Sequence, residues 1–411
     1  MTAPVVVIDN GTGFTKMGYA GNDEPTYIIP STYAGPDPSR TSNDVLGDLD
    51  FAIGNEAMEL ARKSKNHPLS YPLSAGVVQD WDKMERTWQH CFYRYLRVEP
   101  EEHGVILTEP PANPPENREY VAEVMFETFG VKQLHIAVQG VLALTAAKGF
   151  VEERKTGETG TVIDSGDGVT HVVPIVDGYV LTNAIKHIPL AGRTVTNYVL
   201  DKLREREKNI PPDEALQIAQ RVKERYCYVF ADIADEFNKY DDNPEKYLTH
   251  HSDVTKKDGT PYSFDVGYEK FIGPELFFNP SIFSSEHTTP IHKVVDTAIM
   301  ATPIDCRKPL YNNIVLSGGT TMFKGFAPRL QMDLDEIIGA RIAKTKAQSG
   351  RDISIPVKVV SHRRQRYAVW NGGSVLGASP KFGQIAHTRQ EYEEYGPSIC
   401  RGNAMFGDML H

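Results

Sequence analysis

The sequence predicts an α/β protein in which two related domains face each other across a ligand-binding cleft. Residues 7–15 read V-I-D-N-G-T-G-F-T, and residues 162–170 read V-I-D-S-G-D-G-V-T. In each copy a short apolar strand delivers an aspartate, Asp9 or Asp164, and a Gly-x-Gly turn follows it. A single turn of this kind is common in loops, whereas two copies in the same strand context indicate a duplicated domain.

The paired turns also predict the class of ligand. Glycine lets the backbone approach a ligand closely, and successive N–H groups in a tight turn form a concave nest that suits phosphate oxygens. Because two carboxylates would repel phosphates, we expect a cation between them, and Mg²⁺ is commonly held by one or two carboxylates together with phosphates. The alternative is that each hairpin is only a well-formed β-turn without a ligand.

Composition narrows the class of protein. The chain has 411 residues, of which 40% are hydrophobic and 24% charged, a profile typical of a globular protein with two or more domains. A net charge of −10 argues against a general binder of nucleic acid or of anionic membranes. The four cysteines form no C-x-x-C pair, and no apolar run approaches the length of a membrane span. We therefore expect a cytoplasmic protein without membrane insertion.

The first half of the chain predicts a hairpin followed by alternating helices and strands. Asp82 and Glu85 resemble a capping box at the start of an amphipathic helix, and Tyr120 belongs to the apolar set of a second helix. The expected elements are strands at residues 5–8 and 17–20, a loop at 34–50, a helix at 81–98, a strand at 105–107, a helix after Pro115, a strand at 134–138 and a helix at 141–147.

The second half predicts the same order of elements. They are a hairpin from Thr161, a strand at 179–180, helices near 195–206 and 213–226, a buried strand at 314–316 and a helix from about Phe326. A third glycine turn, S-G-G-T-T at 317–321, would contact a nucleotide or simply join strand and helix. We expect an insertion at 236–259, a flexible linker at 344–351 and a solvated basic face at 362–366. P-loop, Rossmann, zinc-protease and nucleophile-elbow motifs are absent from the sequence.

Taken together, the two hairpins and the turn at residues 317–322 resemble the actin family. The segments L-A-G-R at 190–193 and W-N-G-G-S at 370–374 resemble it as well. The resemblance runs from about residue 5 to residue 400, and it implies the actin-like fold that actins share with sugar kinases and chaperone ATPases. ATP and Mg²⁺ would then occupy the cleft. A sugar kinase would also need a catalytic aspartate in a sugar pocket, for which the sequence offers no candidate.

The resemblance implies domain boundaries. Residues 1–34, 72–146 and 368–411 would form the outer domain core, with 35–71 as its small insertion. Residues 147–190 and 286–367 would form the inner domain core, with 191–285 as its insertion.

The resemblance also implies the site residues. Asp9 and Asp164 would hold the cation through water. Gln139 and His171 would position the attacking water, although Gln139 could instead cap the following helix and His171 could be a hydrogen-bonded residue of a buried strand. The expected phosphate-binding residues are Gly11, Thr12, Gly13, Lys16, Gly166, Asp167, Gly168 and Val169, and the expected nucleoside-binding residues are Lys223, Glu224, Gly319, Met322, Phe323 and Arg366. Two positions depart from conventional actin: Arg366 replaces a lysine, and Ala75 replaces a histidine that is modified in actins.

Within the family, the segments at 48–51, 107–111, 186–189, 236–241 and 265–269 and the tail at 396–401 resemble one class of actin-related proteins. That class implies a subunit of a complex that nucleates branched actin filaments by imitating a filament end, and at most a slow ATPase. The implied partners are actin-related protein 2 and the other subunits of the complex, actin filaments and monomers, and nucleation-promoting factors, in the actin cytoskeleton. The alternatives are a conventional filament-forming actin or another actin-related protein.

Overall fold

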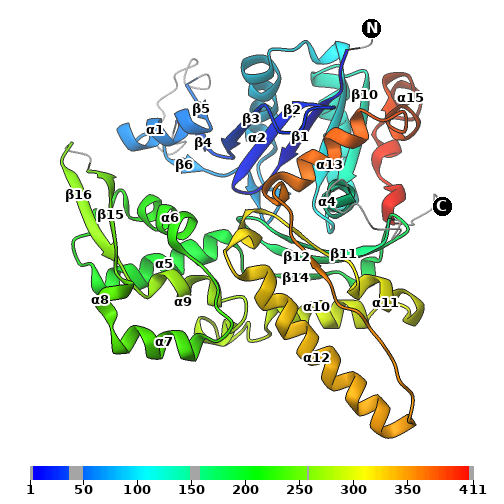
Figure 1. Ribbon diagram of the computed structural model, residues 1–411. Coiled ribbons are helices and arrows are strands. Elements are labelled where there is room, and N and C mark those ends of the chain that lie inside the picture. Colours follow the sequence, from blue (N-terminus) through cyan, green and yellow to red (C-terminus); the bar gives the residue numbers. More distant parts are fainter. Residues whose placement is uncertain (1–2, 37–49, 149–157, 257–258, 407–411) are drawn as a thin grey trace.

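The computed structural model of the protein describes residues 3–36, 50–148, 158–256 and 259–406 (Figure 1). The loop predicted at 34–50 and the end of the C-terminal tail fall mostly outside these residues. Two sheets of six strands organise the described chain, one in the upper part of Figure 1 and one in the lower part. The prediction of an α/β fold with two related halves is confirmed.

The first sheet has the strand order β19-β10-β9-β1-β2-β3. Strands β1 and β2 form the predicted antiparallel hairpin, while β9 pairs in parallel with both β1 and β10. The bounds are β1 (Val6–Asn10), β2 (Phe14–Tyr19), β3 (Tyr27–Pro30), β9 (Gly104–Glu109), β10 (Gln133–Val138) and β19 (His387–Thr388).

The second sheet repeats this arrangement in the order β13-β12-β11-β17-β18, with β14 also paired to β12. Strands β11 and β12 form an antiparallel hairpin, and β11, β17 and β18 run parallel. The bounds are β11 (Gly160–Ser165), β12 (Thr170–Val176), β13 (Tyr179–Val180), β14 (Lys186–Ile188), β17 (Ile314–Ser317) and β18 (Val359–Val360). The duplication read from the two hairpins therefore extends to the parallel strands beside them.

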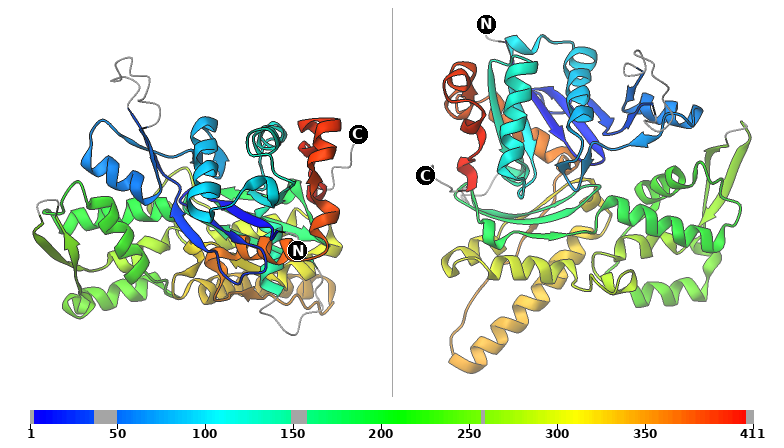
Figure 2. Two further views of the ribbon diagram at one scale, coloured as in Figure 1. Left: turned by 90° about the horizontal axis from the view of Figure 1, so that it is seen from above. Right: turned by 180° about the vertical axis from the view of Figure 1, so that it is seen from behind.

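Two helices, α4 (Gln139–Lys148) and α13 (Ala368–Gly377), pack against each other between the two sheets (Figures 1 and 2). A Cβ atom at Gly372 would lie only 1.9 Å from the carbonyl oxygen of Leu142, so the two backbones touch where a side chain would stand. The fully buried Trp370 donates from Nε1 to the carbonyl of Val7, at 3.0 Å. This core holds residues of both sheets and joins the two halves of the molecule.

The remaining elements surround the sheets. Beside the first sheet lie α1 (Asn55–Lys63), the paired strands β4 (Tyr33–Ala34), β5 (Ala52–Ile53) and β6 (Leu69–Ser70), the hairpin β7 (Leu73–Ser74) and β8 (Val77–Val78), α2 (Trp81–Gln89), α3 (Pro115–Glu123), α14 (Phe382–Ile385) and α15 (Arg389–Tyr395). π-Helical turns, His90–Leu96 and Val124–Thr128, extend α2 and α3. The second half adds α5 (Gly192–Arg206), α6 (Ala215–Tyr226), α7 (Ile233–Asp242), α8 (Pro244–Tyr247), the hairpin β15 (Thr249–Thr255) and β16 (Pro261–Val266), α9 (Glu269–Glu275), α10 (Ile291–Met300), α11 (Ile304–Tyr311) and α12 (Phe326–Ser349).

Several local predictions were wrong. Helix α2 is capped by Asp80, whose side chain accepts from the Lys83 N–H at 3.1 Å, and not by a box at Asp82 and Glu85. Tyr120 is 39% exposed and packs against the ring of Trp81 instead of the core.

The linker predicted at residues 344–351 is also wrong for most of its length. Helix α12 continues to Ser349 and projects away from the lower sheet (Figure 1). The segment is helical because alanine, lysine and glutamine favour helix even where few contacts support them. Gly350 is the C-cap of this helix, and its φ of 68° is a left-handed conformation that glycine adopts readily. The described part of the insertion at 236–259 is structured as well, and it contributes to α7, α8 and β15.

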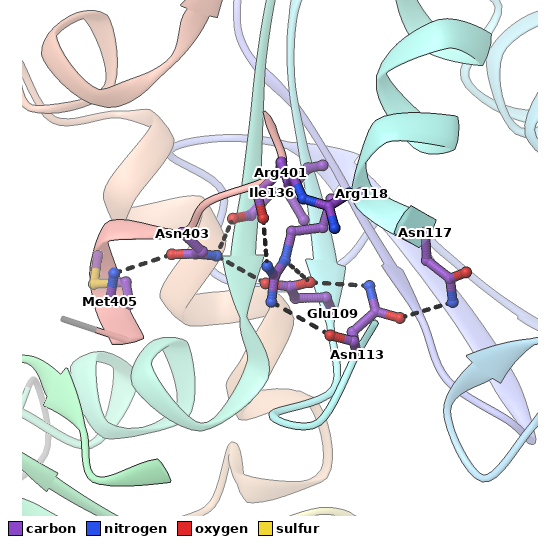
Figure 3. A network of polar contacts seen from close by, with 8 residues as sticks. All are labelled: Glu109, Asn113, Asn117, Arg118, Ile136, Arg401, Asn403 and Met405. Atoms are coloured by element: carbon purple, nitrogen blue, oxygen red, sulfur yellow. Dashed lines mark hydrogen bonds and ion pairs between the residues drawn. The ribbon is translucent and has the colours of Figure 1, made fainter. Parts of the chain in front are cut away.

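The C-terminal tail is anchored to the first sheet through a buried polar cluster (Figure 3). Glu109, at the end of β9, is 2% exposed and forms an ion pair with Arg118 at 2.7 Å. Asn403 of the tail donates from Nδ2 to Glu109 Oε1 at 2.8 Å and to the carbonyl of Ile136 at 3.0 Å. Burial raises the pKa of Glu109, and the Arg118 guanidinium opposes that rise.

We predict that Arg118→Met lowers the free energy of unfolding by about 3–5 kcal/mol, because it leaves the Glu109 carboxylate buried without its counter-ion. Chemical denaturation followed by tryptophan fluorescence measures the change. The matched control is Arg94→Met, which removes the exposed ion pair with Glu56 and should cost about 0–1 kcal/mol. Equal losses in the two variants would contradict a buried, tail-anchoring role for the cluster.

Candidate functional site

A cavity with a volume of about 630 Å³ lies between the two hairpins. Every site residue named from the sequence lines this cavity. They are Asp9, Gly11, Thr12, Gly13, Lys16, Gln139, Asp164, Gly166, Asp167, Gly168, Val169, His171, Lys223, Glu224, Gly319, Met322, Phe323 and Arg366. The structure therefore brings together residues from positions 9 to 366 of the chain, although their binding roles remain predictions.

The two hairpin turns interlock through their glycines. A Cβ atom at Gly13 would lie 2.6 Å from the Cβ of Asp167, and one at Gly168 would lie 2.8 Å from the side chain of Thr12. Gly166 differs, because a Cβ there would meet no atom within 4 Å. Each turn thus needs a glycine where it meets the other turn, and Gly166 borders open space.

Asp9 is fixed through both of its carboxylate oxygens. It lies in β1 and is 2% exposed. Its Oδ2 accepts from Lys16 Nζ at 2.7 Å, since Lys16 is its partner residue across the hairpin. Its Oδ1 accepts from the Thr108 hydroxyl, also at 2.7 Å. The carboxylate is therefore held in one orientation at the edge of the cavity.

Asp164 holds the corresponding place in the second hairpin. Burial raises its pKa, and the negative charge of Asp9 raises it further, whereas the Ser317 hydroxyl and Lys16 lower it. A divalent cation would stabilise the charge of Asp164 that burial and Asp9 disfavour. No group of three or more His, Cys, Asp or Glu residues in the described chain could hold a metal ion alone. The donor set therefore fits Mg²⁺ bound largely through water and phosphate oxygens.

Another part of the cavity is lined by the residues predicted to bind the nucleoside. Lys223 of α6 is buried and donates from Nζ to the carbonyl of Gly192 at 3.0 Å. Burial lowers its pKa. Met322 is 47% exposed, and the Arg366 side chain passes Gly319, where a Cβ atom would be 3.9 Å from Arg366 Cγ. Arg366 is exposed and also lines the cavity, whereas His362 and Gln365 are buried, so the prediction of a solvated basic face at 362–366 was wrong for these two residues.

Some lining residues were not identified as site residues from the sequence. Gly76 donates from its N–H to the Thr12 hydroxyl at 2.8 Å, and it follows Ala75, which has a φ of 50°. Ile28 and Arg225 also line the cavity. The side-by-side pairing of β2 and β3 brings Ile28 to the first hairpin. No local motif marks Ile28 or Arg225, so only the tertiary fold reveals them.

Gln139 and His171 both reach the cavity from its sides. Gln139 is the first residue of α4, is 8% exposed and donates from Nε2 to Thr108 Oγ1 at 3.4 Å. His171 lies opposite Asp164 in the β11–β12 pairing. Burial, and to a smaller extent His187, lowers the pKa of His171 to about 4, so the ring is neutral at physiological pH. The positioning of water by either residue remains a prediction.

Comparison with known proteins relates this geometry to a family. A family model described as Actin matches residues 2–404. The chain is 54% identical over 415 residues to Actin-related protein 3 of Dictyostelium discoideum, an alignment that covers 98% of each chain. Proteins of the same name from Acanthamoeba castellanii and Drosophila melanogaster are 52% and 50% identical, with 99% of this chain and at least 98% of each relative covered. The class of actin-related proteins suggested by the sequence segments is confirmed as the one that bears this name.

No helix in the part of the chain that the structure describes is both long enough and apolar enough to cross a bilayer.

We predict that Gly168→Ala weakens the contact between the hairpins, because its Cβ would lie 2.8 Å from Thr12. The melting temperature should fall by several degrees, which corresponds to about 1–3 kcal/mol for an overpacked contact. The matched control is Gly166→Ala, whose Cβ meets nothing within 4 Å and should leave the melting temperature unchanged. Differential scanning fluorimetry compares the two variants. A larger loss in Gly166→Ala than in Gly168→Ala would contradict the interlocked arrangement.

Two buried histidines predict acid sensitivity. Burial lowers the pKa of His135 and of His171 to about 4, below the ordinary value near 6.5. The unfolded chain therefore binds protons that the folded chain excludes, and stability should fall as the pH drops from about 6.5 to 4. The expected contribution is about 1.4 kcal/mol per pH unit for each histidine.

Unfolding measured across this pH range should show a shallower slope for His135→Gln than for the wild type. His287→Gln, at an exposed position, should leave the slope unchanged. A slope that is the same in all three proteins would contradict the assignment of the proton uptake to His135.

Proposed function

We infer the function of this chain from one premise: the chain belongs to the actin family. We propose that it is the ATP-binding, actin-like subunit of the actin-related protein 2/3 complex, which nucleates branched actin filaments in the cytoplasm. The observation that carries this proposal is identity of 50–54% to proteins named Actin-related protein 3 over nearly the whole length of the chain. The cavity between the hairpins supports ATP as the ligand.

In this proposal ATP lies across both hairpins with Mg²⁺. The N–H groups of the two glycine turns and Lys16 hold the phosphates, while Asp9 and Asp164 hold the cation through water. The buried wall of α6 and the segment Gly319–Met322 hold the nucleoside. Gln139 and His171 serve a slow hydrolysis that is secondary to assembly.

Contacts across the mouth of the cleft support a conformational role for the nucleotide. Arg62 of α1 pairs with Glu214, the residue before α6, and the Glu214 side chain is only 7% exposed. Arg193 of α5 binds Asp167 Oδ2 through two nitrogens, at 2.9 and 3.1 Å, and its guanidinium lies over the Tyr71 ring at 4.4 Å. A ligand that bridges both hairpins would favour the conformation that makes these contacts, through its higher affinity for that conformation.

The proposed assembly role follows from how actin-like subunits pack. Heterologous, head-to-tail contacts propagate into open filaments. Two actin-like subunits held side by side in a complex present the surfaces of a filament end, so that actin monomers add without first forming an unstable nucleus. The domains would then correspond to the predicted outer core at 1–34, 72–146 and 368–411 and inner core at 147–190 and 286–367, with 35–71 and 191–285 as the smaller insertions.

The decisive test is affinity purification of the chain from its own cells with its stoichiometric partners identified. The proposal expects actin-related protein 2 and a fixed set of non-actin subunits, and the purified assembly should shorten the lag of actin polymerisation when a nucleation-promoting factor is added. If the chain is recovered alone and polymerises with ATP and magnesium, it is a conventional filament-forming actin and the proposed assembly is wrong.

We predict that Asp9→Asn and Asp164→Asn each weaken the binding of ATP in magnesium by at least tenfold, because each removes a negative charge facing the cation. A fluorescent ATP analogue titrated into the purified assembly measures the dissociation constant, with and without EDTA. Asp201→Asn, at an exposed position on α5, is the control and should bind like the wild type. Unchanged affinity in both hairpin variants would exclude the proposed cation site.

A further inference from the structure

Thr108 joins two residues of the cavity without lining the cavity itself. Asp9 and Gln139 both line it. The Thr108 hydroxyl lies behind them, 2.7 Å from Asp9 Oδ1 and 3.4 Å from Gln139 Nε2. Thr108 instead borders a small cavity of about 40 Å³, which Asn10 and Leu107 also line. Its contribution to the site must therefore act through its two neighbours.

The sheet topology places Thr108 between these two neighbours. Strand β9 lies between β1 and β10, and it runs parallel to both. Leu107 pairs with Ile8, so Thr108 comes level with Asp9, the next residue of β1. On the other side Thr108 pairs with Ala137, two residues before Gln139. The end of the central strand therefore carries the hydroxyl that the two flanking chain segments share.

The hydrogen-bonding capacity of a hydroxyl determines what Thr108 does there. A hydroxyl has one proton to donate and two lone pairs to accept with. Asp9 accepts from Lys16 through Oδ2 and from Thr108 through Oδ1, so the Thr108 proton is committed to Asp9. Thr108 can then offer Gln139 only a lone pair. The Gln139 amide must therefore turn its NH₂ group toward Thr108, which leaves its carbonyl oxygen Oε1 facing away from Thr108.

We propose that Thr108 is a positioning residue for ATP hydrolysis, because it fixes the Gln139 amide in the orientation that presents Oε1 as an acceptor to water in the cleft. An acceptor of this kind orients the attacking water in phosphoryl transfer. Without the hydroxyl, the Gln139 amide can rotate and present its NH₂ group, which cannot accept from water. This inference rests on the proposed function, since it requires that the cleft bind and hydrolyse ATP.

The test compares Thr108→Val, which keeps the shape and removes the hydroxyl, with Thr108→Ser, which keeps the hydroxyl. Thr145→Val is the matched control, since the Thr145 hydroxyl on α4 donates to the carbonyl of Val141 in its own helix, at 3.0 Å. Each variant is purified in its native assembly. Its dissociation constant for a fluorescent ATP analogue in magnesium, its melting temperature and its single-turnover rate of ATP hydrolysis are then measured.

Thr108→Val should lower the hydrolysis rate by about tenfold or more, within the range that one positioned group contributes. Its dissociation constant should change by less than about threefold, because Lys16 still holds Asp9. Thr108→Ser and Thr145→Val should keep the wild-type rate. In a Gln139→Ala background, Thr108→Val should have no further effect, since the two residues act as one unit.

Each contrary outcome has a distinct meaning. A wild-type assembly that binds no ATP would overturn the proposed function and this inference with it. ATP binding without measurable hydrolysis, or with equal rates in the wild type and Thr108→Val, would overturn the inference alone. An additive effect of Thr108→Val in the Gln139→Ala background would also overturn it, because Thr108 would then act independently of Gln139.

Discussion

The close approach of the two glycine hairpins is the contact on which the site depends. Gly13 faces Asp167, and Gly168 faces Thr12, with no room for a side chain at either glycine. This reciprocal contact brings Asp9 and Asp164 into one cavity, although they come from different sheets. A ligand that binds one hairpin therefore also reaches the other. Burial and the charge of Asp9 raise the pKa of Asp164, and a ligand that carries a cation would relieve the repulsion between the two carboxylates.

The apolar core between the two sheets is a second contact between the halves of the molecule, and helices α4 and α13 lie within it. Helices α4 and α13 meet backbone to backbone at Gly372 and Leu142, and Trp370 ties α13 to β1. Backbones packed this closely leave no room for a side chain at Gly372. The halves therefore meet at the hairpins, in this core and at the mouth of the cleft, where Arg62 pairs with Glu214.

Much of this arrangement could be predicted from the sequence, for an identifiable reason. The hairpin motif occurs twice, and each copy carries its own strand, carboxylate and glycines, so local chemistry determines the topology of both halves. A role for Thr108 in the site could not be predicted from the sequence, because its contacts with Asp9 and Gln139 arise only when β9 lies between β1 and β10. The cap at Asp80 and the end of α12 at Ser349 were missed for a simpler reason: neighbouring residues offered equally good local signals, and only the folded chain decides between them.

The anchoring of the tail has a consequence for how the chain is made. Glu109 lies in the first third of the chain, but it is paired by Asn403, 294 residues later. The first sheet is also incomplete until β19 pairs with β10 and until Trp370 bonds to Val7 of β1. On the ribosome, synthesis of the first sheet begins before that of the second, yet its last strand and its polar anchor emerge only after the second half is complete. The half whose synthesis begins first therefore cannot finish folding until the end of the chain has emerged. A chain released early would lack β19 and Asn403, which complete the first sheet and its polar cluster.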